Sequence, residues 1–157
     1  MHEIMEKQFA ILKLYLPMRG QILDALDDED LDFKAKTLPS VGDTCIQIGE
    51  WQRSYIEGFK TFKQDFNYRT TDLKREISVE KLRSWYRQMD HEMENTIEVM
   101  REEDIESKGI ERGGWEASVE WNLRIWQECL IIFFTKMMVN FKLMGRQLPD
   151  GLAKWIE

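Results

Sequence analysis

Gln47 is the first residue of this chain whose type and position suggest chemistry. The stretch DTCIQIGEWQRSYIEGF, residues 43–59, has the periodicity of a helix with one apolar face, and Gln47 shares that face with Trp51 and Tyr55. Buried polar groups are almost always hydrogen-bonded. The simpler interpretation is therefore an amide paired with a neighbouring polar side chain, and the alternative is a remnant pocket that binds a small polar ligand.

Glu50 follows three residues later on the same predicted helix, close enough to lie beside Gln47. A partly buried carboxyl group has a raised pKa and can act as a general base. The more common role is a salt bridge, for which Arg53 and Arg124 are the predicted partners.

A second set of candidates interrupts the most apolar part of the chain, residues 126–139. Glu128 and Lys136 are either paired or extend to the surface, unless they form a polar network that lines a site. Cys129 would be nucleophilic only beside a cation that favours its thiolate. No histidine neighbours it in sequence, so an inert core thiol is the simpler interpretation.

Other catalytic patterns are missing from the sequence. It contains no glycine-rich phosphate loop, nucleophile elbow or HExxH sequence. ERGGWE, residues 111–116, has paired glycines without a recognisable flanking strand, and we predict only a turn there. The two histidines are His2, at the terminus, and His91, which lies opposite Met89 and Met93 on a predicted helix and should be exposed.

Four amphipathic segments predict the helices that must position these residues. The first covers residues 3–26, with Pro17 inside it and a kink expected there. The second begins near Ser40, the third at about Ser78, and the fourth covers residues 118–144 and ends at Gly145. The tail after Pro149 should pack back through Trp155 and Ile156. Without strand signals, this pattern predicts an all-α four-helix bundle, and its long connections favour a crossover topology.

Composition limits the class of protein. The 157 residues predict a single domain, 1–157, and a net charge of −7 argues against a nucleic-acid partner. Two distant cysteines do not form a disulfide framework. We see no signal peptide, and the longest apolar run is far shorter than the ~20 residues that span a bilayer. These observations predict a cytoplasmic protein without a membrane partner.

The order of these features resembles the DinB-like family of four-helix-bundle proteins. The resemblance begins with LDALDDEDLDFKA, residues 23–35, and continues through LPSVGDTCIQIGEWQRSYIEGF, residues 38–59. It ends with IWQECLIIFFTKMMVNFKLMGRQLP, residues 125–149. The resemblance covers nearly the whole chain and implies a bacterial, homodimeric protein.

The same resemblance implies a site in the interior of the bundle. Typical members bind nickel or zinc through one histidine on helix two and an HxxxH pair on helix four, and the wider superfamily includes thiol-dependent transferases and isomerases. The corresponding positions here are Gln47, Cys129 and Phe133, so the chain resembles a divergent member without the three-histidine site. We expect no metal cofactor, although a divalent ion of another kind remains an alternative.

Three functions follow as hypotheses. The first is a small-ligand-binding or stress-associated protein with a diminished pocket, whose candidate residues are Gln47, Glu50, Trp51, Glu128, Cys129 and Phe133. The second is an enzyme of the thiol S-transferase type, in which oxygens of Gln47, Glu50 and Glu128 bind Mg²⁺ or Mn²⁺. The third is a homodimeric interaction module with a filled interior and an exposed apolar patch on one helix pair.

Overall fold

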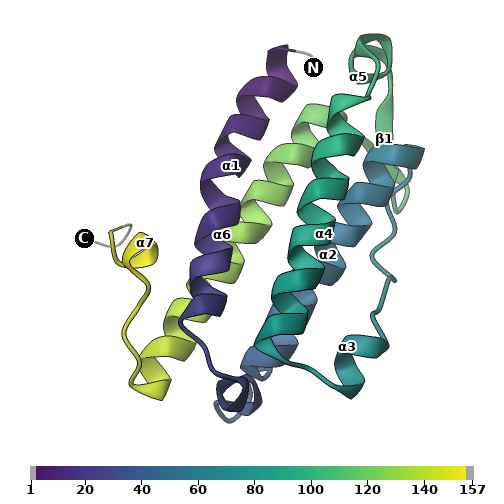
Figure 1. Ribbon diagram of the computed structural model, residues 1–157. Coiled ribbons are helices and arrows are strands. Elements are labelled where there is room, and N and C mark those ends of the chain that lie inside the picture. Colours follow the sequence, from purple (N-terminus) through teal and green to yellow (C-terminus); the bar gives the residue numbers. More distant parts are fainter. Residues whose placement is uncertain (1–2, 155–157) are drawn as a thin grey trace.

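Four long helices pack side by side in the computed structural model, which describes residues 3–154 (Figure 1). Each coincides with one of the four amphipathic segments, and the predicted, mostly helical architecture is confirmed. The long helices are α1 (Glu3–Asp24), α2 (Val41–Thr61), α4 (Val79–Glu98) and α6 (Val119–Met144).

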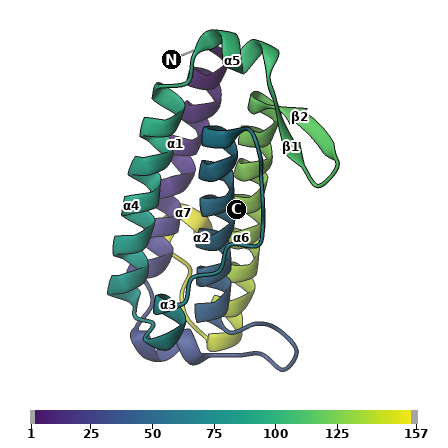
Figure 2. The same ribbon diagram turned by 90° about the vertical axis from the view of Figure 1, so that its right-hand side faces the viewer.

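The long helices differ in direction. α1 and α6 run one way and α2 and α4 run the other way (Figures 1 and 2). α2 packs against α4 and α6, while α1 packs against α6 and α4. Because α2 and α4 are parallel, residues 62–78 return along the outside of α2 before α4 begins, as Figure 2 shows. This segment is a crossover connection, and it contains the short helix α3 (Asp72–Arg75).

The connection between α4 and α6 corrects the sequence analysis. It contains a short helix, α5 (Glu102–Ser107), and an antiparallel hairpin of β1 (Gly109–Arg112) and β2 (Trp115–Ser118). The prediction that no strand flanks the paired glycines was therefore wrong. Gly113 and Gly114 have φ of 59° and 94°, as a two-residue hairpin turn requires. Strands of four residues are too short to show a two-residue periodicity. The Gly-Gly pair, however, is itself typical of a two-residue hairpin turn.

The predicted helix ends are confirmed at four positions. Ser40 caps α2 by accepting a hydrogen bond from the Asp43 N–H, with Asp43 completing a capping box. Ser78 and Ser118 cap α4 and α6 through their own side chains. Gly145 ends α6 with a left-handed φ of 70°.

The ends of the chain pack less regularly. α1 continues through Pro17 and ends at Asp24, before the predicted limit, and the short helix η1 (Asp28–Asp32) follows. The predicted kink stays a prediction. The tail returns to α1 through α7 (Asp150–Ala153), where Leu152 is buried and the Gly151 N–H donates to Gln21. Trp155 and Ile156, which we expected to pack, lie outside the described residues.

The core is formed by the apolar faces of the long helices. The largest fully buried apolar side chains are those of Trp126, Tyr55, Phe59, Phe133, Phe134 and Phe141.

Among the described helices, none is both long and apolar enough to cross a membrane.

Candidate functional site

Gln47 lies half-buried on α2 and faces α6. Lys136 Nζ donates a hydrogen bond to Gln47 Oε1 at 3.0 Å, and the same ammonium group lies 5.5 Å from the centre of the Trp51 ring. The amide is thus paired with a polar side chain of the neighbouring helix. Lys136 reaches it from an exposed position by extending its aliphatic stem.

Glu50 is buried, but its partners differ from those predicted. Its Oε1 accepts a hydrogen bond from the Thr70 N–H at 3.0 Å. Lys74 Nζ lies 3.6 Å from Oε1, and Arg69 Nε lies 3.8 Å from Oε2. These groups belong to the crossover segment, which passes over this face of α2.

The prediction that Glu50 forms a salt bridge is confirmed, but the predicted partners were wrong. Arg53 pairs instead with Glu57 and with Glu92 of α4. Arg124 is an exposed residue of α6. Sequence periodicity identifies which residues share a helix face, but it does not show which connection covers that face.

A small cavity of about 230 Å³ opens beside Glu50. It brings together three of the predicted candidates, Gln47, Glu50 and Trp51. The side chains that line it are those of Asp43, Ile46, Gln47, Glu50, Trp51, Arg69 and Lys74.

The other three candidates lie apart from this cavity. Glu128 is exposed on α6. Cys129 is half-buried, its Sγ lies 3.8 Å from the Tyr55 hydroxyl oxygen, and burial raises the pKa of its thiol. Phe133 is buried against Gln47 and Trp51, where the remaining gap is too small for a water molecule.

The oxygen atoms proposed as ligands of a hard metal ion do not surround one point in this arrangement. The Gln47 oxygen accepts a hydrogen bond from an ammonium group, and two cations approach the Glu50 carboxylate. Across residues 3–154, no group of three or more histidine, cysteine, aspartate or glutamate side chains has the arrangement of a metal site. The residues present therefore do not fit the oxygen-ligand site of the enzyme hypothesis.

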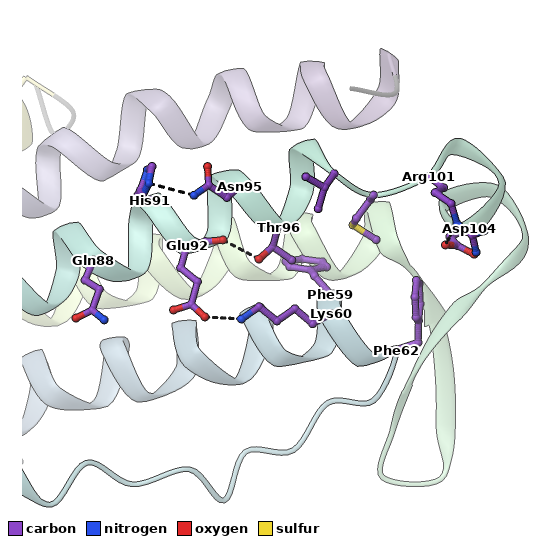
Figure 3. Close-up of a pocket in the computed structure, with 12 residues that line it drawn as sticks. Phe59, Lys60, Phe62, Gln88, His91, Glu92, Asn95, Thr96, Arg101 and Asp104 are labelled. Carbon is purple, nitrogen blue, oxygen red and sulfur yellow. Dashed lines mark hydrogen bonds and ion pairs between the residues drawn. The ribbon is translucent and has the colours of Figure 1, made fainter.

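A larger cavity than the one beside Glu50 was not predicted from the sequence. It is an open groove of about 740 Å³ between the last turns of α2 and α4 and the beginning of α5 (Figure 3). Phe59, Phe62, Val99 and Met100 give it an apolar surface. Three of these residues, Phe62, Val99 and Met100, follow the end of a long helix, and helical periodicity does not show where the chain goes beyond that end.

One polar wall of the groove comes from α4. Glu92 forms ion pairs with Lys60 and with Arg53, whose Nη1 lies 2.5 Å from the Glu92 carboxylate. Partial burial opposes ionisation of Glu92, but the hydrogen bonds from Lys60 and Arg53 outweigh it and lower its pKa. His91 is exposed, as predicted, and its ring is hydrogen-bonded to the Asn95 side chain (Figure 3).

The opposite end of the groove is formed by α5. Arg101 donates two hydrogen bonds to Asp104, at 2.8 and 3.0 Å, and Lys108 lies 2.7 Å from the same carboxylate. The Arg101 hydrogen bonds, followed by that of Lys108, lower the pKa of Asp104 to about 2. Lys108 also lies 4.7 Å from the centre of the Phe62 ring. The Asp104 carboxylate and the Phe62 ring at this end of the groove are thus both held by neighbouring cations.

Sequence analysis also missed a buried ionic network at the centre of the molecule. Arg19 of α1 is only 1% exposed and donates to Asp90 of α4 at 2.5 Å and to Gln52 of α2 at 2.6 Å. Its guanidinium carbon lies 3.9 Å from the centre of the Tyr86 ring. The network joins three helices and lines neither of the two cavities.

The thiols show no sign of activation. Burial raises the pKa of Cys45 to about 12, and the pKa of Cys129 is also raised. Both groups are protonated at neutral pH, so neither has the thiolate character of a reactive cysteine.

The sequence matches no protein-family model, and no curated protein matches it either.

Proposed function

We propose that this protein binds a small, largely apolar ligand in the groove between α2, α4 and α5. The observation that carries the proposal is the groove itself, since a volume of about 740 Å³ lies within the usual range of small-molecule sites, roughly 300–1,000 Å³. Its apolar surface supplies contact area, and the fixed polar groups at its edges orient the ligand.

The proposed relationship to the DinB-like family agrees with this role. Four long helices, a crossover between α2 and α4, and the confirmed helix caps are compatible with it. We propose a cytoplasmic, stress-associated bacterial protein that uses a groove at the end of the helices instead of a three-histidine metal site. The raised pKa values of both thiols favour binding over thiol transfer.

Binding of a neutral, environment-sensitive dye such as Nile red tests the groove. Val99 is 78% exposed within it, and replacing Val99 with Gln removes apolar contact area without disturbing the core. We expect saturable binding to the native protein and affinity about tenfold lower for Val99→Gln, since a loss of about 1.4 kcal/mol corresponds to that factor.

Leu143 provides the matched control, because it is 55% exposed on α6 and does not line the groove. Leu143→Gln should leave dye binding unchanged. Absence of saturable binding would refute the proposed function, and so would an equal loss of affinity in the two variants.

A second candidate, the homodimeric interaction module, is favoured by the outer face of α6. Ile132, Val139 and Leu143 are exposed and recur at helical spacing along it. Sedimentation equilibrium of the native protein and of Ile132→Glu tests this role. A dimer that dissociates in the variant would support it, and a native monomer would exclude it.

A further inference from the structure

The cavity beside Glu50 is separate from the groove, and the two have no lining residue in common. It lies along the first half of α2, whereas the groove lies at the end of that helix. The crossover segment forms its outer wall through Arg69 and Lys74. A ligand in this cavity would therefore occupy a second, independent site.

Two cations face this cavity without being satisfied by the carboxylate between them. Arg69 Nε and Lys74 Nζ lie 3.8 and 3.6 Å from Glu50 oxygens, well beyond the roughly 2.7–2.9 Å of a charge-assisted hydrogen bond. Arg69 uses Nη1 to hold the backbone carbonyls of Phe66 and Tyr68. Its side chain is 56% exposed and that of Lys74 is 48% exposed, so their remaining N–H groups are accessible.

The polar groups around the two cations also offer donors. The hydrogen bond from Lys136 uses the Gln47 oxygen and leaves the amide nitrogen as the free end of that side chain. One oxygen of Glu50 accepts the Thr70 N–H, which fixes the carboxylate between the cations. Two carboxylates also line the cavity, and each already accepts a backbone hydrogen bond: Asp43 from the Ser40 N–H and Glu50 from the Thr70 N–H. An anion placed against Arg69 and Lys74 would meet hydrogen-bond donors from the crossover segment and from α2.

We propose that this cavity binds a small anion carrying a carboxylate or phosphate group. Arg69 and Lys74 contact the anion, and Gln47 donates a further hydrogen bond. The Glu50 carboxylate, which the Thr70 N–H fixes in place, competes with the anion for the two cations. A volume of about 230 Å³ admits a metabolite-sized anion and is too small for most drug-sized ligands.

Proton–nitrogen correlation spectra of ¹⁵N-labelled full-length protein test the proposal, with inorganic phosphate and succinate as separate probes and sodium chloride matched for ionic strength. We expect saturable shifts of the Gln47 side-chain amide, the Trp51 indole N–H and the Thr70 backbone N–H. Arg69→Gln and Lys74→Gln should each weaken binding about tenfold, the factor given by losing one charged contact of about 1.4 kcal/mol. Lys7→Gln removes an exposed lysine on α1 and should have no effect.

Glu50→Gln gives the sharpest result, because it keeps an oxygen for the Thr70 N–H and removes the negative charge. We expect this variant to bind phosphate several-fold more tightly than the native protein, which a purely structural role would not produce. Shifts that do not saturate, or that Lys7→Gln reduces as much as Lys74→Gln, would overturn the proposal. Nile red binding, measured on the same samples, tests the groove separately. Loss of anion binding with Nile red binding retained would therefore refute only the anion site.

Discussion

Asp104 shows at the scale of one residue how charge fixes an edge of the groove. Arg101 and then Lys108 lower its pKa to about 2, below the value of about 3.9 expected in an unfolded chain. The ionised carboxylate therefore stabilises the folded state above pH ~4, and this contribution is lost as the pH falls towards ~2.

Asp104→Asn should accordingly lower the free energy of unfolding at pH 7 and have progressively less effect on acidification. Urea unfolding of the native and variant proteins, repeated between neutral and acidic pH, measures the difference. Glu103→Gln, an exposed neighbour in α5, is the matched control and should show little change. A constant difference across this pH range would exclude the assigned ion pairs.

Individual residues were predicted well where the helix itself determines their environment. The exposure of His91 and the positions of the caps follow from periodicity and local hydrogen bonding. The partners of Glu50 were predicted wrongly because they come from a connection more than a dozen residues away. Gln47 and Trp51 lie at one cavity, but Cys129 does not, because two turns of α2 separate Gln47 from the Tyr55 that Cys129 contacts.

At the scale of elements, the helix caps allow a direct comparison between two similar sequences. Ser40 is part of a reciprocal capping box with Asp43, whereas the third residue of α4 is Lys81, which cannot return the hydrogen bond to Ser78. Ser40→Ala should lower the free energy of unfolding by about 1 kcal/mol, and Ser78→Ala should lower it by less.

Chemical denaturation monitored by circular dichroism measures both changes. Asp43→Asn retains a side-chain oxygen and should cost less than Ser40→Ala. If Ser78→Ala proves the more damaging of the two serine changes, the reciprocal bond of the capping box does not contribute to stability as argued here.

The hairpin shows why short elements escaped prediction. Each strand has four residues, and the exposed positions of β2 give no alternation of apolar and polar side chains. The hairpin is stabilised by pairing between the two strands and by the turn at Gly113 and Gly114. The long helices, by contrast, repeat their apolar pattern over five or more turns and were identified from the sequence.

At the scale of the whole molecule, sequence patterns predicted the long helices but not which of them are neighbours. Helix neighbours depend on the path of the connections, and a crossover between α2 and α4 makes these two helices parallel. Arg19 illustrates the same limit, because an arginine between Met18 and Gly20 has no sequence feature that indicates burial. Only the packing of α1 against α4 and the nearby α2 encloses it.

The Arg19 network makes a prediction about how these three helices are held together. Removing one partner of a buried ion pair leaves an uncompensated charge, which costs about 3–5 kcal/mol, while replacing the pair with apolar groups is often nearly neutral. Asp90→Ala should therefore be strongly destabilising, because it leaves the guanidinium of a 1% exposed residue without its carboxylate.

The double variant Arg19→Met/Asp90→Leu should recover much of that loss, since it removes both charges and keeps side-chain volume. Unfolding free energies of Arg19→Met, Asp90→Leu and the double variant form a cycle that isolates the coupling between the two residues. The exposed pair of Arg83 and Asp24 also joins α4 to α1 and is the matched control. Breaking it with Arg83→Met should cost less than about 1 kcal/mol. Additive losses at Arg19 and Asp90 would show that the two charges do not act as a pair.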